Sequence, residues 1–351
     1  MMTRQSERRI HGKVSIPTVA ALCMFAAAIA LTGSYLWSSR APAPAPAGPL
    51  EQITIATNSS YVGTCAIVAA RDKGFFKNEG IVAELQTYSS GKAAMAAVLQ
   101  GSSNFGTVAD IPVMFAGLDD NPVYVIATIF KADKDHGIVG RRDRGVLTPG
   151  SLKGKRIGVT PKTSGHFTLD AFLNRQKLSP DEVTLLNYKP EDLPNALEKG
   201  EVDAVATWEP FLDSVLERLG DKGVIYYGQD IYESLYNIAS LRSYVDKHPE
   251  TIKKFLRAIG RGARFCVDSP DAARALFPTD VKSEEKRLQA LWPTYRFNVV
   301  LDQGLILALE DEARWAIKNK LTTRTDMPNY LNYVYLDGME AVMPAAVTII
   351  H

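Results

Sequence analysis

Cysteine and histidine are scarce in this sequence, and none of them is spaced as in a metal site. The 351 residues include three cysteines and five histidines, and the histidines lie far apart, at positions 11, 136, 166, 248 and 351. Metal and haem sites built from these residues need at least two of them within a few positions of each other. We therefore expect no metal ion and no other cofactor.

Short catalytic motifs are also missing. A phosphate-binding loop needs an upstream glycine before Gly-Lys and a Ser or Thr after it, and Gly154-Lys155 lacks both. The sequence contains no nucleophile elbow of the form Gly-x-Ser-x-Gly and no protein-kinase signature. We therefore predict a protein that is not an enzyme, with no catalytic residues.

Charge of one sign is not in excess. Residues 1–50 hold five of the 40 basic and one of the 39 acidic side chains, which leaves 35 against 38 and a formal net charge of −3 beyond residue 50. Proteins that bind nucleic acid or anionic membrane surfaces carry a basic surplus. The charge balance therefore argues against both as partners of the main body.

The N-terminus has the pattern of a membrane segment. Residues 1–13 are basic, and residues 14–37 form an uncharged, mostly apolar run of 24 residues. At a rise of about 1.5 Å per residue such a helix is roughly 36 Å long, enough to cross a bilayer. Basic residues on its amino side predict a cytoplasmic N-terminus and an exported body. Residues 38–50 are rich in Pro and Ala and predict a stiff linker.

The sequence leaves open whether this segment is a retained anchor or a cleaved signal. Ala45-Pro46-Ala47 has the small-x-small form of a signal peptidase site but lies far beyond the apolar run. Cys23 would suit a lipid anchor, but the bulky Leu22 precedes it and the apolar run continues past it. We favour the uncleaved anchor, and in both cases the body is exported. In an oxidising compartment the two cysteines beyond residue 50 either form a disulfide or remain buried thiols.

Two stretches of the body share one pattern. In the first, Gly101 ends a helix and a short buried strand leads to Asp110. In the second, Gly200 ends a helix and a similar strand leads to Glu209, so both intervals are nine residues long. The pattern predicts an α/β protein with two similar halves, although any two α/β segments share part of it. Eight-residue intervals match in the same way in a second pair of segments, Ile55–Gly63 and Ile157–Gly165.

Four segments in order carry a resemblance to a known family. They are Gly74-Phe75-Phe76-Lys77-Asn78-Glu79-Gly80-Ile81, Leu152-Lys153-Gly154-Lys155-Arg156-Ile157-Gly158-Val159, Ala196-Leu197-Glu198-Lys199-Gly200-Glu201-Val202-Asp203-Ala204 and Trp208-Glu209-Pro210. Together they resemble the solute-binding proteins of ABC importers, in the nitrate, taurine and aliphatic-sulfonate group with its thiamine-pyrimidine relatives. The resemblance covers roughly residues 52 to 350. The cysteine-rich signature of the pyrimidine synthases is absent.

The resemblance implies a type II periplasmic-binding fold, in which two α/β lobes joined by a two-stranded hinge close on a ligand. We expect lobe 1 to comprise residues 51–132 and 242–351, and lobe 2 residues 133–241. It also implies that the protein captures a small polar organic molecule or anion on the periplasmic or extracytoplasmic face, tethered to the inner membrane by residues 14–37. The implied partners are the ligand and an ABC permease with its ATPase, and no nucleic acid. A membrane-tethered ligand sensor and a pyrimidine-related enzyme are the alternatives.

Three polar loops are candidates for the ligand site, because each follows a strand and begins a helix. Unpaired N–H groups at such positions suit anionic or polar ligand groups. Each small hydroxyl there either binds the ligand or caps its own helix. The candidates in these loops are Asn58, Ser59, Ser60, Tyr61, Ser89, Ser90, Gly91, Thr163, Ser164 and His166.

Two carboxylates and a tryptophan complete the predicted site. Asp110 and Glu209 stand at matched positions in the two halves and would together suit an amine or a ring N–H donor. Alternatively, each pairs with a nearby basic residue or caps the helix that follows. Trp208 is predicted to form an apolar wall of the site, or otherwise to pack in the core. Lys92 is interpreted as a solvated helix residue rather than a ligand contact.

Overall fold

The computed structural model describes residues 49–228, 231–277 and 282–351. The predicted basic segment, the predicted membrane segment and nearly all of the linker lie outside the described residues. Within the described part, no helix has both the length and the apolar character needed to span a membrane. The fold that follows is therefore that of the predicted exported body.

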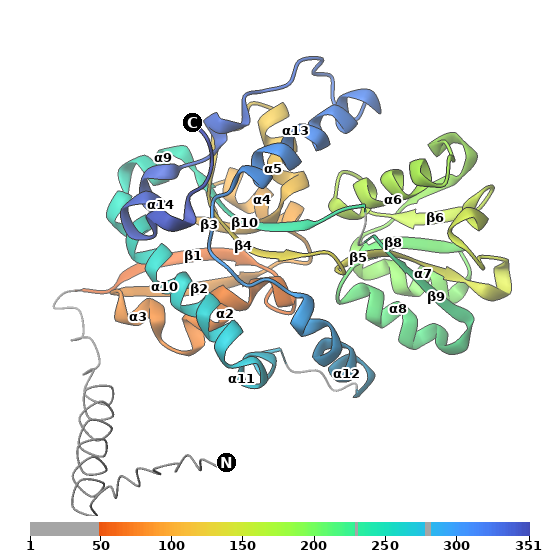
Figure 1. Cartoon of the computed structure of the whole chain (residues 1–351), viewed down its shortest axis with the longest axis horizontal. Helices are drawn as coiled ribbons and strands as arrows, with labels where there is room; N and C mark the ends of the chain where they lie inside the picture. The colour runs from red at the N-terminus through yellow and green to blue at the C-terminus, as the bar shows by residue number, and fades with distance from the viewer. Residues whose placement is uncertain (1–48, 229–230, 278–281) are drawn as a thin grey trace, which may run out of the picture. The chain divides into compact units, whose positions relative to one another are not determined.

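The first sheet has five strands in the order β2-β1-β3-β10-β4 (Figure 1). β1 pairs in parallel with β2 and β3, while β10 runs antiparallel between β3 and β4. The strands are β1 (Glu51–Thr57), β2 (Ile81–Thr87), β3 (Phe105–Ala109), β4 (Val123–Ala132) and β10 (Ser234–Leu241). The helices that accompany this sheet are α2 (Cys65–Asp72), α3 (Phe75–Asn78), α4 (Gly91–Leu99), α5 (Asp110–Leu118), α9 (Arg242–Lys247), α10 (Pro249–Asp268), α11 (Pro270–Arg274), α12 (Lys282–Leu291), α13 (Gln303–Lys318) and α14 (Leu336–Val342).

The second sheet repeats this order as β7-β6-β8-β5-β9. β6 is parallel to β7 and β8, and β5 is antiparallel to β8 and β9. The likeness of the two sheets agrees with the repeated pattern seen in the sequence. The strands are β5 (His136–Arg141), β6 (Arg156–Val159), β7 (Thr184–Asn187), β8 (Ala204–Trp208) and β9 (Gly223–Tyr227), and the helices are α6 (Ser164–Arg175), α7 (Leu193–Lys199) and α8 (Phe211–Leu219).

The chain passes between the sheets twice. β4 of the first sheet leads through residues 133–135 into β5 of the second, and residues 228–233 lead from β9 back to β10. The predicted second lobe ends at residue 241 and so includes β10, whereas β10 pairs within the first sheet. The reason is that β10 is the returning strand, and its fully buried Ile238 and Ala239 complete the first core.

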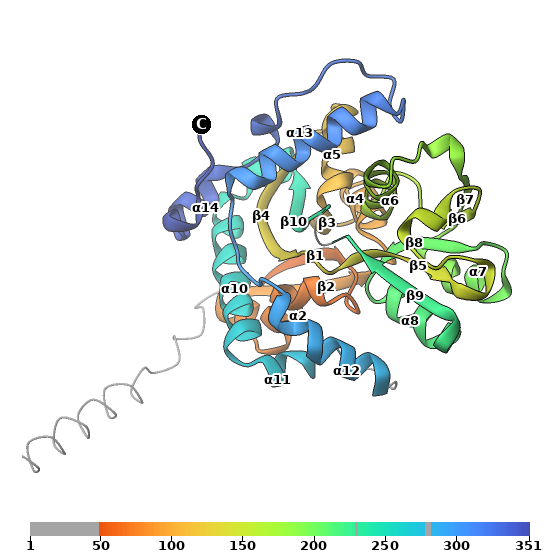
Figure 2. The same ribbon diagram turned by 45° about the vertical axis from the view of Figure 1, so that its right-hand side comes forward.

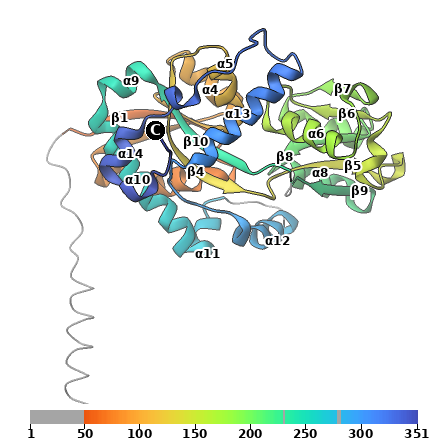
Figure 3. The same ribbon diagram turned by 45° about the horizontal axis from the view of Figure 1, so that its top comes forward.

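Each sheet has its own core. The first is one continuous cluster, in which Phe255 of α10 stacks on Phe105 of β3 at a centroid distance of 4.2 Å. Burying one such side chain stabilises the fold by about 1.5–3 kcal/mol. The second sheet has an apolar cluster on each face, one under α6 and one under α7 and α8. Figures 2 and 3 show α10 and α13 beside the first sheet and α6 and α8 beside the second.

A disulfide joins two helices of the first lobe. Cys65 at the start of α2 and Cys266 near the end of α10 are bonded and fully buried, with Cα atoms 6.3 Å apart. The helices approach closely because Gly262 has no side chain, and a Cβ atom there would lie 2.0 Å from the carbonyl oxygen of Ala66. Of the two possibilities that the sequence left open, the cysteines therefore form the disulfide.

Candidate functional site

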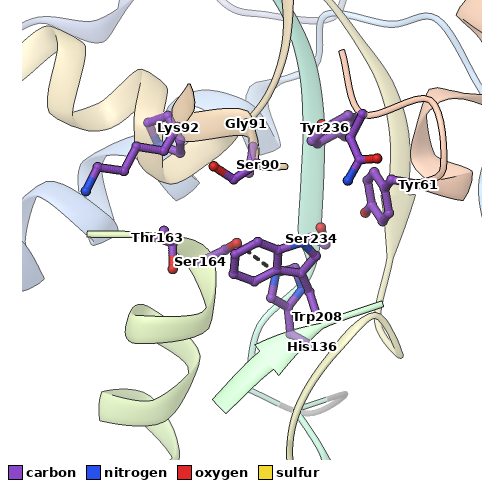
Figure 4. Close-up of a pocket in the computed structure, with 13 residues that line it drawn as sticks. Tyr61, Ser90, Gly91, Lys92, His136, Thr163, Ser164, Trp208, Ser234 and Tyr236 are labelled. Atoms are coloured by element: carbon purple, nitrogen blue, oxygen red, sulfur yellow. Dashed lines mark hydrogen bonds between the residues drawn. The ribbon is translucent and has the colours of Figure 1, made fainter. Parts of the chain in front are cut away.

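A pocket lies where the carboxyl ends of the parallel strands of both sheets meet (Figure 4). This edge is where open α/β sheets place their ligands. The cavity itself is small, about 20 Å³, and lies within about 430 Å³ of empty space that includes open solvent. Its lining is Asn58, Tyr61, Ser90, Gly91, Lys92, Ala109, Pro112, His136, Thr163, Ser164, Trp208, Ser234 and Tyr236.

Two helices from different sheets begin at this pocket. Ser90 precedes α4, and its hydroxyl accepts a hydrogen bond from the backbone N–H of Ala93 at 3.2 Å. Thr163 precedes α6, and its hydroxyl donates to the carbonyl of Thr160 at 2.7 Å instead of capping the helix. The first N–H groups of a helix have no partner within it and carry a partial positive charge. The two helix ends therefore offer an anion hydrogen-bond donors from opposite sides.

Charged side chains in the lining are of one sign. Lys92 lines the pocket, and its Nζ donates to the carbonyl of Pro161 in the second lobe at 3.1 Å. Partial burial and then the nearby Lys162 lower the pKa of Lys92. The described residues that line the pocket include no aspartate and no glutamate. The electrostatics of the lining thus favour an anionic group.

A chain of polar contacts connects the two sides of the pocket. The Tyr61 hydroxyl donates to Asp135 Oδ2 at 2.8 Å, and His136 Nδ1 lies 3.2 Å from the same oxygen. His136 Nε2 lies 2.7 Å from Ser164 Oγ. Asp135 is fully buried and raises the pKa of Tyr61 further, after the larger effect of burial. His136 is next to Trp208 because the two residues are paired between β5 and β8.

The structure brings together about half of the residues predicted for the site. Each loop that was predicted to contribute does so through at least one residue. The members that line the pocket are Asn58, Tyr61, Ser90, Gly91, Thr163, Ser164 and Trp208, and those that do not are Ser59, Ser60, Ser89, Asp110, His166 and Glu209.

Asp110 lies beneath the pocket rather than in its lining. It is fully buried at the first position of α5, where its Oδ1 accepts from the N–H of Ile111 at 2.9 Å and from the Tyr232 hydroxyl. Burial raises the pKa of Asp110, although these hydrogen bonds oppose the shift. Glu312 of α13 is an acidic neighbour of Asp110. The helix-capping alternative describes its position better than ligand contact.

Glu209 also caps a helix. Its Oε2 accepts from the N–H of Asp213 in α8 at 3.1 Å, and its Oε1 accepts from the Tyr227 hydroxyl at 3.5 Å. Burial, and then the charges of Asp213 and Asp135, raise the pKa of Glu209 well above its usual value. With Ser59 and Ser60 it lines a separate, larger pocket beside α12.

His166 points away from the ligand pocket. Its Nδ1 accepts from the N–H of Lys162 at 3.3 Å, and its ring packs edge-on against Trp315 of α13. Burial lowers the pKa of His166, while Asp170 opposes that shift. Ser89 is exposed on the surface beside the pocket.

Several lining residues could not be found from the sequence. The sequence favoured a solvated helix position for Lys92. In the structure Lys92 is the second residue of α4 and lines the pocket. Ser234 and Tyr236 belong to β10, whose pairing with β3 spans more than a hundred residues. His136 begins β5, and its pairing with Trp208 of β8 spans 72 residues within the second sheet. Ala109 and Pro112 flank the predicted Asp110 and are the residues that reach the pocket in its place.

Comparisons with known proteins agree with this geometry. A model of the NMT1/THI5-like family matches residues 63–273. A putative aliphatic sulfonates-binding protein of Bacillus subtilis is 25% identical over 265 residues, which cover 72% of this chain and 78% of that protein. A taurine-binding periplasmic protein of Escherichia coli is 24% identical over 210 residues, 59% of this chain and 64% of that protein.

Solved structures show the same fold. The alkanesulfonate-binding protein SsuA from Xanthomonas axonopodis pv. citri, bound to MOPS, superposes with a TM-score of 0.71 at 19% identity, over 82% of this chain and 99% of that one. The periplasmic nitrate-binding protein NrtA from Synechocystis PCC 6803 gives a TM-score of 0.67 at 12% identity, over 84% and 89%. The predicted resemblance and the periplasmic-binding fold of two α/β lobes are thus confirmed, whereas the two-stranded hinge stays a prediction.

Proposed function

Because the chain belongs to the NMT1/THI5-like family, we propose that it is an extracytoplasmic solute-binding protein that captures a small organic oxyanion, of the sulfonate kind, for an ABC importer. The observation that carries the proposal is the convergence of the N-termini of α4 and α6 on a pocket whose described lining holds Lys92 but no carboxylate. An oxyanion matches such donors, whereas an amine would meet like charge. The names of the relatives, which are binding proteins for sulfonates and taurine, support the same ligand class.

The proposed partners follow from this role. The loaded protein docks on a membrane permease that works with an ATPase, and residues 14–37 tether it to the inner membrane on the periplasmic face. Tethering raises its effective concentration at the permease. Residues 133–135, which join β4 to β5, and the connection from β9 to β10 are the proposed hinge. Catalysis is not part of the proposal, since the relatives reported above are named for binding.

A thermal-shift screen of the full chain tests the ligand class. The panel holds ethanesulfonate, taurine, nitrate, ethylamine and a pyrimidine. Ligand at about 100 times its dissociation constant stabilises by roughly 2.7 kcal/mol, which for a body of this size is a shift of about 4 °C. The proposal predicts shifts with the sulfonates and none with ethylamine; a shift with ethylamine alone would contradict it.

A pair of lysine variants locates the effect in the pocket. Lys92→Gln removes the cation of the lining and should weaken sulfonate binding by about 1 kcal/mol, or about fivefold, because the side chain is partly solvated. Lys77→Gln on the exposed face of α3 removes the same charge far from the lining and should leave affinity unchanged.

A further inference from the structure

His136 is a buried titratable group at the centre of the pocket. Its side chain is 4% exposed, and its Nδ1 lies near Asp135. Its Nε2 contacts Ser164, as Figure 4 shows. Ser164 is the first residue of α6, at the helix end that faces the pocket. The protonation of this ring therefore decides which atoms Ser164 presents to a ligand.

The contact with Asp135 fixes the proton on one nitrogen. A carboxylate is an acceptor only, and Oδ2 of Asp135 already accepts from Tyr61. The 3.2 Å separation from His136 Nδ1 is attractive only if Nδ1 carries a proton. Nδ1 makes no hydrogen bond within the described part of the chain, and the charge of Asp135 at 3.2 Å is the contact that favours a proton on this nitrogen.

A neutral imidazole has one N–H, and with that proton on Nδ1 the other nitrogen is an acceptor. Ser164 then donates its hydroxyl proton to Nε2 across the 2.7 Å contact. In this state the pocket meets the lone pairs of Ser164 Oγ. Those lone pairs repel an oxyanion.

An oxyanion in the pocket requires the opposite arrangement. If Ser164 donates to the anion instead, Nε2 keeps its partner only by donating to Oγ, and with Nδ1 also protonated both ring nitrogens then carry protons. The imidazolium is balanced by the carboxylate of Asp135 and by the bound anion. The pocket lies at the N-terminus of α6, which favours negative charge, so a bound anion stabilises the imidazolium and accepts from Ser164.

We propose that capture of an oxyanion by this pocket is coupled to the uptake of a proton by His136, which switches Ser164 from acceptor to donor toward the ligand. The proton comes from solvent, and the only bond formed is the Nε2–H bond of the imidazolium. The inference rests on the proposed function and adds its proton linkage. His136 is a positioning residue here, because it acts on the ligand through Ser164.

The other charges around the ring set the sign of the pH dependence. Acidic groups favour the imidazolium and burial opposes it. A bound anion adds to the first effect, so the proposal predicts an affinity that is highest at low pH and falls as the pH rises. A sulfonate stays ionised throughout and adds no titration of its own. The titratable side chains that surround His136 in the pocket and beneath it are Tyr61, Lys92, Asp110, Asp135, Glu209 and Tyr232.

Calorimetry of the full chain with ethanesulfonate measures the coupling. Titrations near neutral pH in Bis-Tris and in Tris, two buffers that are not sulfonates and differ in ionisation enthalpy, report the protons exchanged with the buffer. The proposal predicts different enthalpies in the two buffers, equivalent to uptake of a fraction of one proton per ligand. Ser164→Ala should lose about tenfold in affinity together with this uptake, as expected for a hydrogen bond to a charged group.

Histidine variants assign the proton. His136→Gln keeps a neutral N–H donor but cannot titrate, so binding should survive in weakened form with equal enthalpies in both buffers. His248→Gln is the matched control, because His248 is exposed beside Tyr244 in the first lobe and should leave the uptake unchanged. If His136→Gln does not fold, the wild-type affinity itself decides, since the proposal requires it to fall as the pH rises.

The outcomes separate the two proposals. Binding of ethanesulfonate with equal enthalpies in both buffers, or with an affinity that does not change with pH, overturns the coupling and leaves the proposed function standing. Retention of the uptake in His136→Gln overturns the assignment to this histidine. Failure of ethanesulfonate, taurine and nitrate all to bind overturns the proposed function and the coupling together.

Discussion

At the scale of single residues, the acids near the site belong to the fold and not to the pocket. Asp110 and Glu312 are both buried, and the charge of Asp110 raises the cost of ionising Glu312, whereas the contact with Glu312 lowers the pKa of Asp110. Burial, followed by the charge of Asp110, raises the pKa of Glu312 well above its usual value. Two carboxyl groups in such contact hold one proton between them near neutral pH.

This pair makes stability depend on pH in a defined direction. Because the pKa of Glu312 is raised in the folded state, its contribution is fully present below the usual pKa of a glutamate and is lost as the pH rises through the raised value. Glu312→Gln mimics the protonated form. At about pH 8 its free energy of unfolding should exceed that of the wild type by on the order of 1–2 kcal/mol, and its melting temperature should be higher. Near pH 5 the two proteins should be equally stable. Thermal melts at both pH values measure this.

A neighbour on the same helix provides the control. Glu310→Gln removes a partly exposed carboxylate and should show no such pH-dependent gain. If Glu312→Gln changed the melting temperature equally at both pH values, the buried pair would not share a proton.

Most of the candidate residues that line the pocket are those whose position depends on local structure. Ser90, Gly91, Thr163 and Ser164 begin helices directly after strands, and that pattern can be recognised within a dozen residues. Whether Asp110 faces the pocket or the core depends instead on Tyr232 and Glu312, which lie 122 and about 200 positions away. A one-dimensional pattern does not contain that packing.

At the scale of elements, the disulfide ties the N-terminal and C-terminal parts of the first lobe together. It closes a chain segment with a sequence separation of 201 between α2 and α10. In the chain-entropy model a loop of this length contributes about 5 kcal/mol, and measured losses on removing native disulfides are about 2–5 kcal/mol. Reduction should therefore lower the melting temperature by several degrees.

Alkylation provides the matching count of thiols. In the denatured but unreduced chain, one of the three cysteines, Cys23, should react with iodoacetamide, and after reduction all three should react. Mass spectrometry distinguishes the two states. Three modified cysteines without reductant would show that Cys65 and Cys266 are free, and the predicted loss of stability on reduction would then fail as well.

The elements themselves were predictable to different degrees. β3 and β8 follow Gly101 and Gly200, whose positive φ angles of 71° and 73° end the preceding segments as the glycine pattern predicted. The expected bounds placed β10 in the second lobe, whereas it pairs in the first sheet, because a buried apolar strand does not reveal in which of two sheets it pairs. That information lies in its antiparallel register with β3 and β4.

At the scale of the molecule, side chains of the first lobe reach the second at three places around the pocket. Trp315 of α13 donates to Asp170 of α6 at 2.9 Å. Figure 2 shows these two helices near each other. Lys92 reaches the Pro161 carbonyl, and Arg287 of α12 forms an ion pair with Asp213 of α8. These contacts hold the lobes against each other around a small pocket, as expected of a protein that closes on its ligand.

The fold and the family could be predicted from the sequence more easily than the ligand. Four sequence segments in order were enough to indicate the fold, and the relatives agree with it. Of the two alternatives that the sequence left open for Asp110 and Glu209, a ligand contact and a helix cap, the hydrogen bonds in the structure favour the cap, because matched positions in the two halves do not imply matched orientation. Both carboxylates cap helices, and Lys92 lines the pocket instead.

The most direct test of the account is the position of a bound sulfonate. Crystals of the protein grown with bromoethanesulfonate would locate the ligand through the anomalous scattering of bromine. The account predicts the sulfonate oxygens between the N-termini of α4 and α6, within hydrogen-bond distance of Ser164. A ligand bound instead in the pocket lined by Ser59, Ser60 and Glu209 would contradict it.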